Sequence, residues 1–371
     1  MCIRDRPITY GFDPATGLIL MAGVYYGAVF GGSTSSILLN APGVPGTVAT
    51  SFDGYPMAQQ GKAGKALAIA AWSSFAGGTF SAIYLLFLAP SLSKVSLSFR
   101  SPDYFALMIL GLTAIAAFSS KGQFLKAMMM VVLGLMLASV GQDSLSDITR
   151  FTFDNMNLTD GISFVLVVMA TFAMSEALTI ILKRNDPTAA AKQVSLTELG
   201  SIKIEKEDRK KMYKTIPRSS VIGFLIGVLP GAGATIASFL AYGMERNLVK
   251  DDEKQKFGKG SVNGLSAPET ANNAACSGSF VPMLTLGIPG SGTTAVMLGA
   301  LLGFGVQPGP RLYMTNPEIF WSIIMSMYIG MVILLILNLP LIPYIARILA
   351  VPKNYLIPLI LFFSITGIYV M

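Results

Sequence analysis

Long apolar segments alternate with short polar loops along most of the chain. A helix that crosses a bilayer needs about 20 predominantly apolar residues, and many segments reach or approach that length. The predicted spans are 18–39, 66–89, 103–119, 124–140, 161–182, 218–241, 273–306 (interrupted), 319–339 and 354–371. This pattern predicts an all-α polytopic membrane protein with about 9–10 transmembrane segments, several of them broken or re-entrant.

The composition agrees with a membrane protein and removes several other classes. Charged residues make up 13% of the chain, against about 25% in an average soluble domain. The net charge of +7 comes from Lys and Arg in the loops between spans, so it does not indicate a nucleic-acid partner. The chain contains no histidine, which excludes His-ligated zinc, His-based triads and histidine proton relays. Two cysteines, Cys2 and Cys276, provide neither a disulfide framework nor a metal-ligand spacing.

The charges of the loops predict the orientation of the spans, because Lys and Arg accumulate on the cytoplasmic side. Segment 183–218 contains ten Lys or Arg and five Asp or Glu, and we expect it to be cytoplasmic. Loop 141–160 contains four Asp and one Arg and should lie outside. Counting spans backwards then places the loop Gly61–Lys65 inside and the loop 91–102 outside.

Two short matches predict an internal duplication. The segments "GVYYGAVFGGSTS" from Gly23 and "GFLIGVLPGAGAT" from Gly223 both carry glycine at the first, fifth and ninth positions. The segment "GKAGKAL" from Gly61 is more loosely similar to "GKGSVNGL" from Gly258. Five predicted spans separate the two glycine ladders, so the copies should be inverted, as in many secondary transporters.

The predicted organisation follows from this duplication. We expect residues 1–6 to be a non-native leader, 7–182 the first transmembrane repeat, 183–217 a cytoplasmic loop, and 218–371 a second repeat truncated at its C-terminus.

Three Pro-Gly breaks interrupt the spans, in "SSILLNAPGVPGT" (35–47), "GVLPGAGAT" (227–235) and "TLGIPGSGTT" (285–294). Backbone amides freed there cannot face lipid, so the breaks should lie within protein or line a watery cavity. A half-helix that starts at such a break directs free N–H groups and a positive dipole end toward mid-membrane, where they can bind a carboxylate. We expect Asn40–Thr47 and Gly287–Thr294 to line one shared cavity.

The candidate substrate-binding residues belong to these breaks: Ser33, Thr34, Ser35, Asn40, Gly43, Gly46, Thr47, Gly231, Gly233, Thr235, Gly287, Gly290, Ser291, Gly292, Thr293 and Thr294. The alternative is a kink with close helix packing, since a small-xxx-small spacing alone supports packing. For the glycine ladders themselves we prefer the packing interpretation; for the Pro-Gly breaks we prefer the binding site.

A second polar stretch, "APETANNAACSGS" (267–279), precedes the interrupted span. Glu269, Asn272 and Asn273 lie at i, i+3 and i+4 and would share one helical face. We interpret them as candidates for ion coupling, although an exposed amphipathic turn fits the spacing equally well. Glu176 is a second ionisable residue in a span, but it lies near the end of that span and can reach the interface.

The motifs of common enzymes are absent from the sequence. It contains no G-x-x-x-x-G-K-[ST], no H-E-x-x-H and no G-x-S-x-G. "GSGTTA" from Gly290 fits a loose dinucleotide pattern but lacks a βαβ setting. We therefore expect no catalytic residues, no cofactor and no bound metal, apart from a transported Na⁺. A different class stays open: an intramembrane enzyme or channel-like subunit that uses Glu269 as acid and base.

The motifs together resemble the large membrane subunit of tripartite tricarboxylate transporters (TctA type). The resemblance rests on "GGSTSSILLNAPGVPGT", "FDGYPMAQQGKAGKAL", "LPGAGATIASFLAY", "FGKG", "APETANNAA" and "LTLGIPGSGTTAVMLGALLGFGVQPGP", and it covers the chain from about Gly17 onward. Residues that match its motifs are Asn40, Pro42, Gly43, Glu269, Asn272, Asn273, Gly287, Pro289, Gly290, Ser291 and Gly292.

The resemblance implies a multi-pass carrier of the bacterial inner membrane. It would import tricarboxylates such as citrate, or dicarboxylates, by coupling to an Na⁺ or H⁺ gradient. It also implies a small membrane subunit and a periplasmic solute-binding protein as partners. Members of the family are longer at both ends. The first break has its own sequence, "NAPGVPGT", which leaves the roles of Val44 and Pro45 open.

Overall fold

The computed structural model describes residues 12–40, 42–96, 100, 124–142, 148–159, 161–162, 200–229 and 233–348, with isolated residues between 102 and 178. The chain divides into two units, which are described separately. One comprises Phe12–Ser98 and Arg184–Lys353, and the other Met1–Gly11, Phe99–Lys183 and Asn354–Met371. Apart from isolated residues, the predicted spans 103–119, 161–182 and 354–371 lie outside the described residues, as do Glu176 and positions 183–199 of the predicted cytoplasmic loop.

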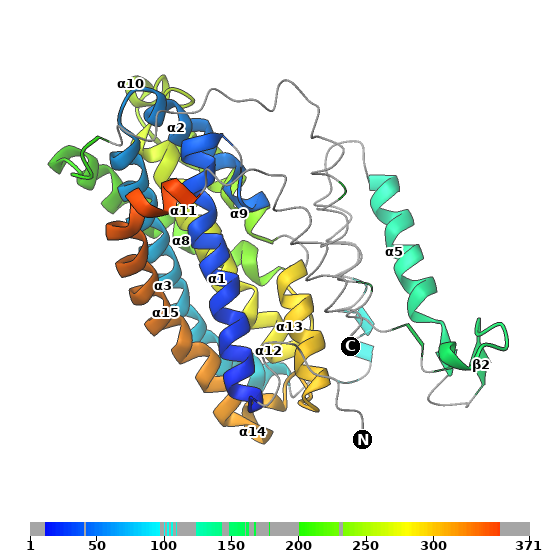
Figure 1. The fold of residues 1–371 in the computed structure, drawn as a ribbon. Coiled ribbons are helices and arrows are strands. Elements are labelled where there is room, and N and C mark those ends of the chain that lie inside the picture. The colour runs from blue at the N-terminus through cyan, green and yellow to red at the C-terminus, as the bar shows by residue number, and fades with distance from the viewer. Residues whose placement is uncertain are drawn as a thin grey trace. The chain divides into compact units, whose positions relative to one another are not determined.

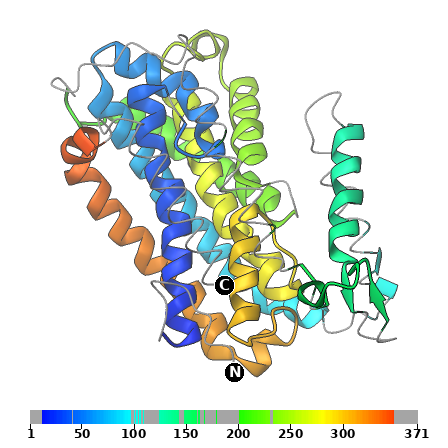
Figure 2. The same cartoon turned by 45° about the vertical axis from the view of Figure 1, so that its right-hand side comes forward.

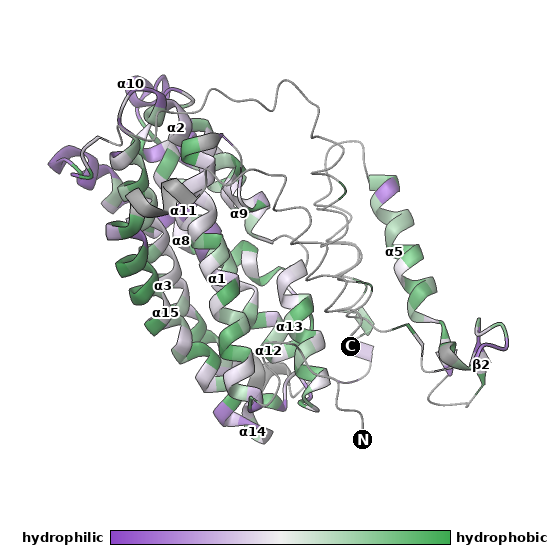
Figure 3. Cartoon of the chain, viewed as in Figure 1, coloured by the Kyte–Doolittle hydropathy of each residue, from purple (hydrophilic) through white to green (hydrophobic). Residues whose placement is uncertain are grey.

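The first unit is all-helical in its described part (Figures 1 and 2). Its elements are α1 (Pro14–Leu39), η1 (Pro45–Thr47), α2 (Val48–Gln59), α3 (Ala63–Ser96), α8 (Lys206–Val228), α9 (Gly233–Leu248), α10 (Asp251–Lys254), α11 (Val262–Gly278), α12 (Phe280–Leu286), α13 (Gly292–Gly303), α14 (Leu312–Thr315) and α15 (Pro317–Ile348). Within α1, α3 and α15, the segments Pro14–Leu38, Ala63–Ser91 and Pro317–Leu341 are long and apolar enough to cross a membrane. Figure 3 shows hydrophobic residues along these helices and hydrophilic residues around α10. The chain is an all-α polytopic membrane protein.

The described part of the second unit contains α5 (Phe124–Ala138), β1 (Gly141–Gln142), β2 (Thr149–Arg150) and η2 (Met156–Leu158). The helix α5 confirms most of the predicted span 124–140, and its 15 residues are apolar apart from one lysine. The strands β1 and β2 pair antiparallel, with Gly141 opposite Arg150. This short ribbon was not predicted, because strands of two residues leave no detectable alternation in the sequence.

Local signals in the sequence set the ends of α1. Asp13 caps the helix by accepting a hydrogen bond of 3.0 Å from Thr16 N, and Pro14 occupies the first turn, where a missing N–H costs nothing. At the other end Asn40 adopts the left-handed conformation with φ of 51° and terminates the helix. The chain then folds back along α1, where Gly43 N donates to Gly32 O, before η1 and α2 begin.

The helix α11 forms the centre of the unit. All 17 of its residues are buried, and it packs against α3, α8 and α9. Its many Ala, Gly and Ser residues allow these neighbours to approach closely. The alternative in which 267–279 is an exposed turn is therefore wrong.

Glycines on α8 provide one of these close contacts. A Cβ added at Gly223 would lie 2.6 Å from Ala271 Cα, and one at Gly227 would lie 2.7 Å from Ala275 Cα. The packing interpretation is thus confirmed for two members of the second glycine ladder. The first ladder has no comparably close contact: a Cβ at Gly27 would lie 3.8 Å from Leu334 Cδ2, an ordinary contact, and one at Gly31 would meet nothing within 4 Å.

The predicted span 218–241 is interrupted at its predicted break, because α8 ends at Val228 and α9 begins at Gly233. It does not continue across the membrane in one direction, because α8 and α9 form an antiparallel hairpin. Arg218 Nη2 lies 2.7 Å from Glu245 Oε1, and further out Lys211 Nζ lies 3.0 Å from Glu253 Oε1, just beyond α9. The polar ends of both helices therefore lie on the same side of the unit. The sequence at the turn is apolar with Pro230 and Gly231, so hydropathy does not distinguish an antiparallel hairpin from a crossing helix.

Helices that follow the second sequence match run in the same direction. Along α3 and α11, Ser73 Oγ lies 2.7 Å from Ser266 Oγ, and further on Ser81 Oγ donates to Ala274 O at 2.6 Å, so the two helices are parallel. The segments from Gly61 and Gly258 lead into these two helices. Their sequence similarity therefore gives no support to an inverted orientation. The inverted repeat stays a prediction that rests on the glycine ladders.

Candidate functional site

Glu269 lies near the middle of α11, fully buried between α2 and α3. Its Oε1 accepts a hydrogen bond from Thr50 Oγ1 of α2, and its Oε2 accepts one of 2.8 Å from Ser74 Oγ of α3. Among the described residues, no Lys or Arg forms an ion pair with it. A carboxyl group held by hydroxyls without a fixed cation can exchange a proton or contact a mobile cation.

Asn272 and Asn273 add unsatisfied polar atoms beside this carboxyl group. Asn273 Nδ2 donates to Glu269 O at 3.0 Å, while Asn273 Oδ1 has no partner in the described structure. Both polar atoms of Asn272 are buried and likewise without a partner there. Unpaired buried amides cost roughly 1–3 kcal/mol each, so their presence in a native core marks a position that a ligand can satisfy.

The first break folds back against α1 rather than continuing it. Gly43 N donates to Gly32 O at 3.4 Å, and a Cβ at Gly43 would lie 2.8 Å from Gly32 Cα. This close approach requires glycine at position 43, where any Cβ would collide with the backbone of α1. The chain then turns at η1 and starts α2, which places the first turn of α2 beside α11.

Most hydroxyls of the first break are used within it. Ser33 Oγ donates to Phe30 O at 2.8 Å, Ser35 Oγ to Gly32 O at 3.2 Å, and Thr47 Oγ1 to Val44 O at 2.9 Å. These bonds stabilise the fold of the break. Thr34 is buried, whereas Asn40 is exposed at the end of α1.

The first and second breaks meet at Asn272. A Cβ at Gly46 would collide with Asn272 Oδ1 and would lie 3.2 Å from Ala234 Cβ in the first turn of α9. Gly233 begins α9 with φ of 61°, and Thr235 is half-buried in the same turn. Gly231 lies outside the described residues. Two helix N-termini, those of α2 and α9, thus converge on one buried amide.

The third break surrounds the N-terminus of α13. Ser291 caps this helix and exchanges hydrogen bonds with Thr294 in a capping box. Tyr25 Oη of α1 lies 3.1 Å from Ser291 Oγ and 3.4 Å from Ser279 Oγ. A Cβ at Gly290 would lie 2.9 Å from Ser279 Cα, so only glycine fits there.

The remaining candidates of the third break differ in exposure. Gly287 ends α12 with φ of 71°, close to the carbonyl of Pro308. Gly292 is half-buried, and Thr293 is exposed in the first turn of α13.

The third break is displaced along the same helices from the first two. Ser279 follows Asn272 by seven residues on α11, which corresponds to a rise of about 10 Å. The shared cavity between the first and third breaks stays a prediction; the contacts join the first break to the second.

Several residues of this site were not predicted. Thr50 and Ser74 donate hydrogen bonds to Glu269, and Tyr25 is hydrogen-bonded to Ser279 and Ser291. A signal existed for Ser74, since the pair Ser73–Ser74 is polar within an apolar span. Tyr25 gave no such signal, because tyrosine is ordinary in membrane helices.

A second buried carboxylate, Asp53, joins α2 to the chain before α11. Its Oδ1 accepts from Gly258 N, Gly260 N and Ser261 N at 2.9, 2.9 and 2.7 Å, and Tyr242 Oη donates to its Oδ2 at 3.1 Å. Burial raises the pKa of the Asp53 carboxyl, against the lowering effect of these hydrogen bonds. The contact fixes the middle of α2 to the segment that leads into α11.

Glu245 provides a corresponding buried contact within the α8–α9 hairpin. Its Oε1 accepts from Thr215 Oγ1, Arg218 Nη2 and Asn263 Nδ2 at 2.8, 2.7 and 3.0 Å. The ion pair closes the open end of the hairpin and ties it to α11.

The long apolar helices define a multi-pass membrane protein, whose interior contains broken helices and a buried polar row on α11. The chain belongs to the tripartite tricarboxylate transporter TctA family, which it matches over residues 6–371.

Two relatives come from Agrobacterium vitis. The chain is 43% identical over 363 residues to an uncharacterized 52.8 kDa protein in the TAR-I ttuC' 3'region, covering 98% of this chain and 71% of that protein. It is 46% identical over 147 residues to an uncharacterized protein in the TAR-II ttuC' 3'region, covering 40% of this chain and 60% of that protein. No solved structure matches the chain.

Proposed function

We propose that this chain is the large carrier subunit of a binding-protein-dependent secondary transporter that imports small organic anions. Its substrates are tricarboxylates such as citrate, or dicarboxylates, and its location is the bacterial inner membrane. A periplasmic solute-binding protein delivers the anion, and a small membrane subunit completes the complex. Family membership supports this proposal, and the site supports the class of substrate.

The observation that carries the proposal is the convergence of the α2 and α9 N-termini on Asn272. The first N–H groups of a helix have no partner within it, and the helix dipole favours an anion there. The unpaired Asn272 amide can donate a further hydrogen bond through Nδ2. A substrate carboxylate at this point would therefore meet several donors without a basic side chain.

The coupling ion would bind to oxygen atoms close to this anion site. Glu269 and the unpaired Asn273 Oδ1 and Thr270 Oγ1 lie on the same buried helix. Carboxylate, amide and hydroxyl oxygens suit a hard cation, and a carboxyl group alone can carry a proton. Adjacent cation and anion sites would make the binding of one ion favour that of the other.

Uptake by proteoliposomes tests the function. The vesicles contain the large and small membrane subunits, with candidate solute-binding proteins and radiolabelled citrate outside. We expect uptake that requires the binding protein and collapses when the Na⁺ gradient or the H⁺ gradient is dissipated. Uptake that persists without either gradient would contradict a gradient-driven carrier, and the ionophore that stops uptake identifies the coupling ion.

A further inference from the structure

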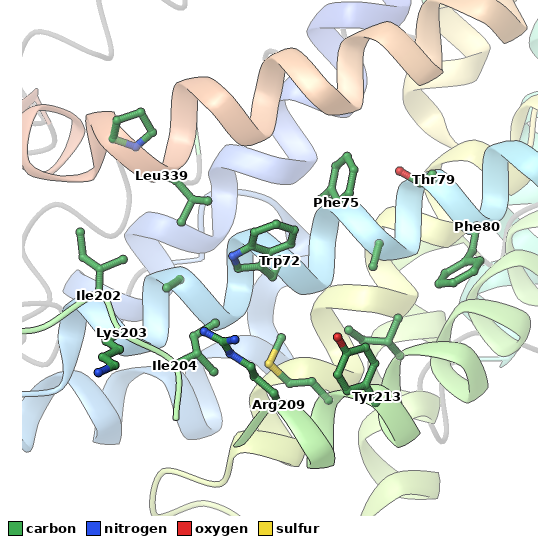
Figure 4. Close-up of a pocket in the computed structure, with 15 residues that line it drawn as sticks. Trp72, Phe75, Thr79, Phe80, Ile202, Lys203, Ile204, Arg209, Tyr213 and Leu339 are labelled. Carbon is green, nitrogen blue, oxygen red and sulfur yellow. The ribbon is translucent and has the colours of Figure 1, made fainter. Parts of the chain in front are cut away.

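A cavity of about 850 Å³ opens between α3, α15 and the start of α8, away from the breaks (Figure 4). Its volume falls within the range of about 300–1,000 Å³ that is typical of ligand sites. The wall is formed mainly by apolar side chains, with Trp72, Phe75 and Phe80 on α3 and Leu339 on α15. Trp72 and Phe80 are 43% and 39% exposed, so this wall is accessible to an apolar chain from the membrane.

The polar groups of this cavity gather at one end. Lys203 and Arg209 lie near the N-terminal end of α3, with Tyr213 beside them, while Thr79 and Phe80 lie toward the other end (Figure 4). The lining residues of α3 run from position 68 to position 80, a rise of about 18 Å. One leaflet of the hydrocarbon core is about 15 Å thick, so the cavity matches the depth of a single leaflet.

The charged end carries a net positive charge. The acids next to it, Glu205 and Asp208, lie 3.3 and 2.6 Å from Lys65 Nζ. These ion pairs with Lys65 neutralise part of the negative charge of the two acids. Within the described part of the chain, Lys203 and Arg209 form no ion pair. Both are exposed at the mouth of the cavity and remain available to an anion.

We propose that this cavity binds one anionic phospholipid, with its phosphate between Lys203 and Arg209 and an acyl chain along Trp72, Phe75 and Phe80. Basic pockets between membrane helices bind anionic headgroups, and the cationic end with its apolar wall reproduces the polarity of such a lipid. The lipid would join α8, which forms the hairpin with α9, to the two spans α3 and α15.

The test is lipid retention by the whole protein. The purified chain is reconstituted in vesicles of equal parts phosphatidylglycerol and phosphatidylcholine, extracted in mild detergent, and analysed by native mass spectrometry. We expect wild type to keep phosphatidylglycerol in preference to phosphatidylcholine. The double variant Lys203→Gln/Arg209→Gln should bind phosphatidylglycerol roughly 30-fold more weakly, since each basic residue contributes about a fivefold effect near an anionic headgroup.

A matched control separates this site from general attraction to the membrane. The double variant Lys206→Gln/Lys210→Gln removes two positive charges from the same turns of α8 without altering a residue of the cavity wall. It should keep the preference for phosphatidylglycerol. Equal losses in both double variants, or no preference in wild type, would overturn the proposal. Unchanged thermal unfolding of each variant shows that the protein is folded.

Photochemical cross-linking identifies what covers the apolar wall. Phe80→p-benzoylphenylalanine in cell membranes should form an adduct with phospholipid. An adduct with another segment of this chain, with a second copy or with a different protein would show that polypeptide covers the wall, and would overturn the lipid site.

Discussion

Ser74 Oγ donates a hydrogen bond of 2.8 Å to Glu269 Oε2 and thereby links the buried middle of α3 to the centre of α11. Thr50 makes the equivalent bond to the other carboxyl oxygen from α2. The hydrogen bonds of Glu269 therefore depend on the positions of α2 and α3. These two helices flank the point near Asn272 where the first and second breaks meet. A change of charge at Glu269 would act directly on the start of α2, where the anion site is proposed.

Glu269→Gln should lower uptake strongly. The substitution keeps the size of the side chain but removes the charge and one acceptor, and hydrogen bonds to a charged group contribute enough for a roughly 10–100-fold effect. The measurement is initial uptake at equal amounts of protein in the membrane. Glu318→Gln, at an exposed carboxyl group in the first turn of α15, serves as the control and should stay near wild type. Equal and mild effects of both changes would reduce Glu269 to a structural residue.

Gly46→Ala should abolish uptake, because the new methyl group would collide with Asn272 Oδ1. Gly31→Ala provides a matched control on α1, where nothing lies within 4 Å of the added Cβ. Alanine in a helix is more favourable than glycine by about 0.5–1 kcal/mol, so this control should unfold at the same or a higher temperature. Tolerance of Gly46→Ala in the uptake assay would show that Asn272 does not face the site.

Anion recognition at the third break should depend on backbone N–H groups rather than on a basic side chain. Gly290→Val should abolish uptake, since even a Cβ there would lie 2.9 Å from Ser279 Cα. Ser291→Ala should be milder and cost about 0.5–2 kcal/mol, the usual loss of a helix cap. Arg311→Gln, in the loop before α14, should leave the half-saturating substrate concentration largely unchanged. The opposite order of effects would contradict the role of the α13 N-terminus.

Arg218→Gln should destabilise the protein, because it leaves Glu245 buried without its cation. Arg218 is partly exposed, so we expect a loss of about 1–3 kcal/mol, less than for a fully buried pair. Thermal unfolding in detergent measures the effect. The double variant Arg218→Met/Glu245→Met should recover part of the loss, since an apolar pair carries no uncompensated charge. An additive loss in the double variant would show that the ion pair is not the relevant interaction.

Cysteine labelling checks the orientation of the helices. In a background with Cys2→Ser and Cys276→Ala, an impermeant reagent added outside should modify Gln307→Cys but not Lys256→Cys. Gln307 lies in the loop between α13 and α14, and Lys256 lies just after α10, among basic residues expected to be cytoplasmic. The reverse labelling pattern would invert the predicted topology.

The sequence by itself determined the class of the protein and most of its parts. Runs of apolar residues identified helices α1, α3, α5 and α15 and placed their starts within four residues, because helix formation and membrane insertion are decided locally. The helices α3 and α15 extend seven and nine residues beyond the predicted spans. The Pro-Gly breaks were also local signals, since proline and glycine remove or expose backbone hydrogen bonds wherever they stand. The row of Glu269, Asn272 and Asn273 followed from helical spacing alone.

Only the tertiary structure decided how these parts meet. The hairpin of α8 and α9 depends on long-range contacts such as Arg218 with Glu245, which hydropathy does not encode. The partners of Glu269, Thr50 and Ser74, are distant in the chain and reach it because glycine and alanine allow three helices to approach α11 closely. A local pattern fixes which residues share a face of a helix, whereas packing decides what that face contacts.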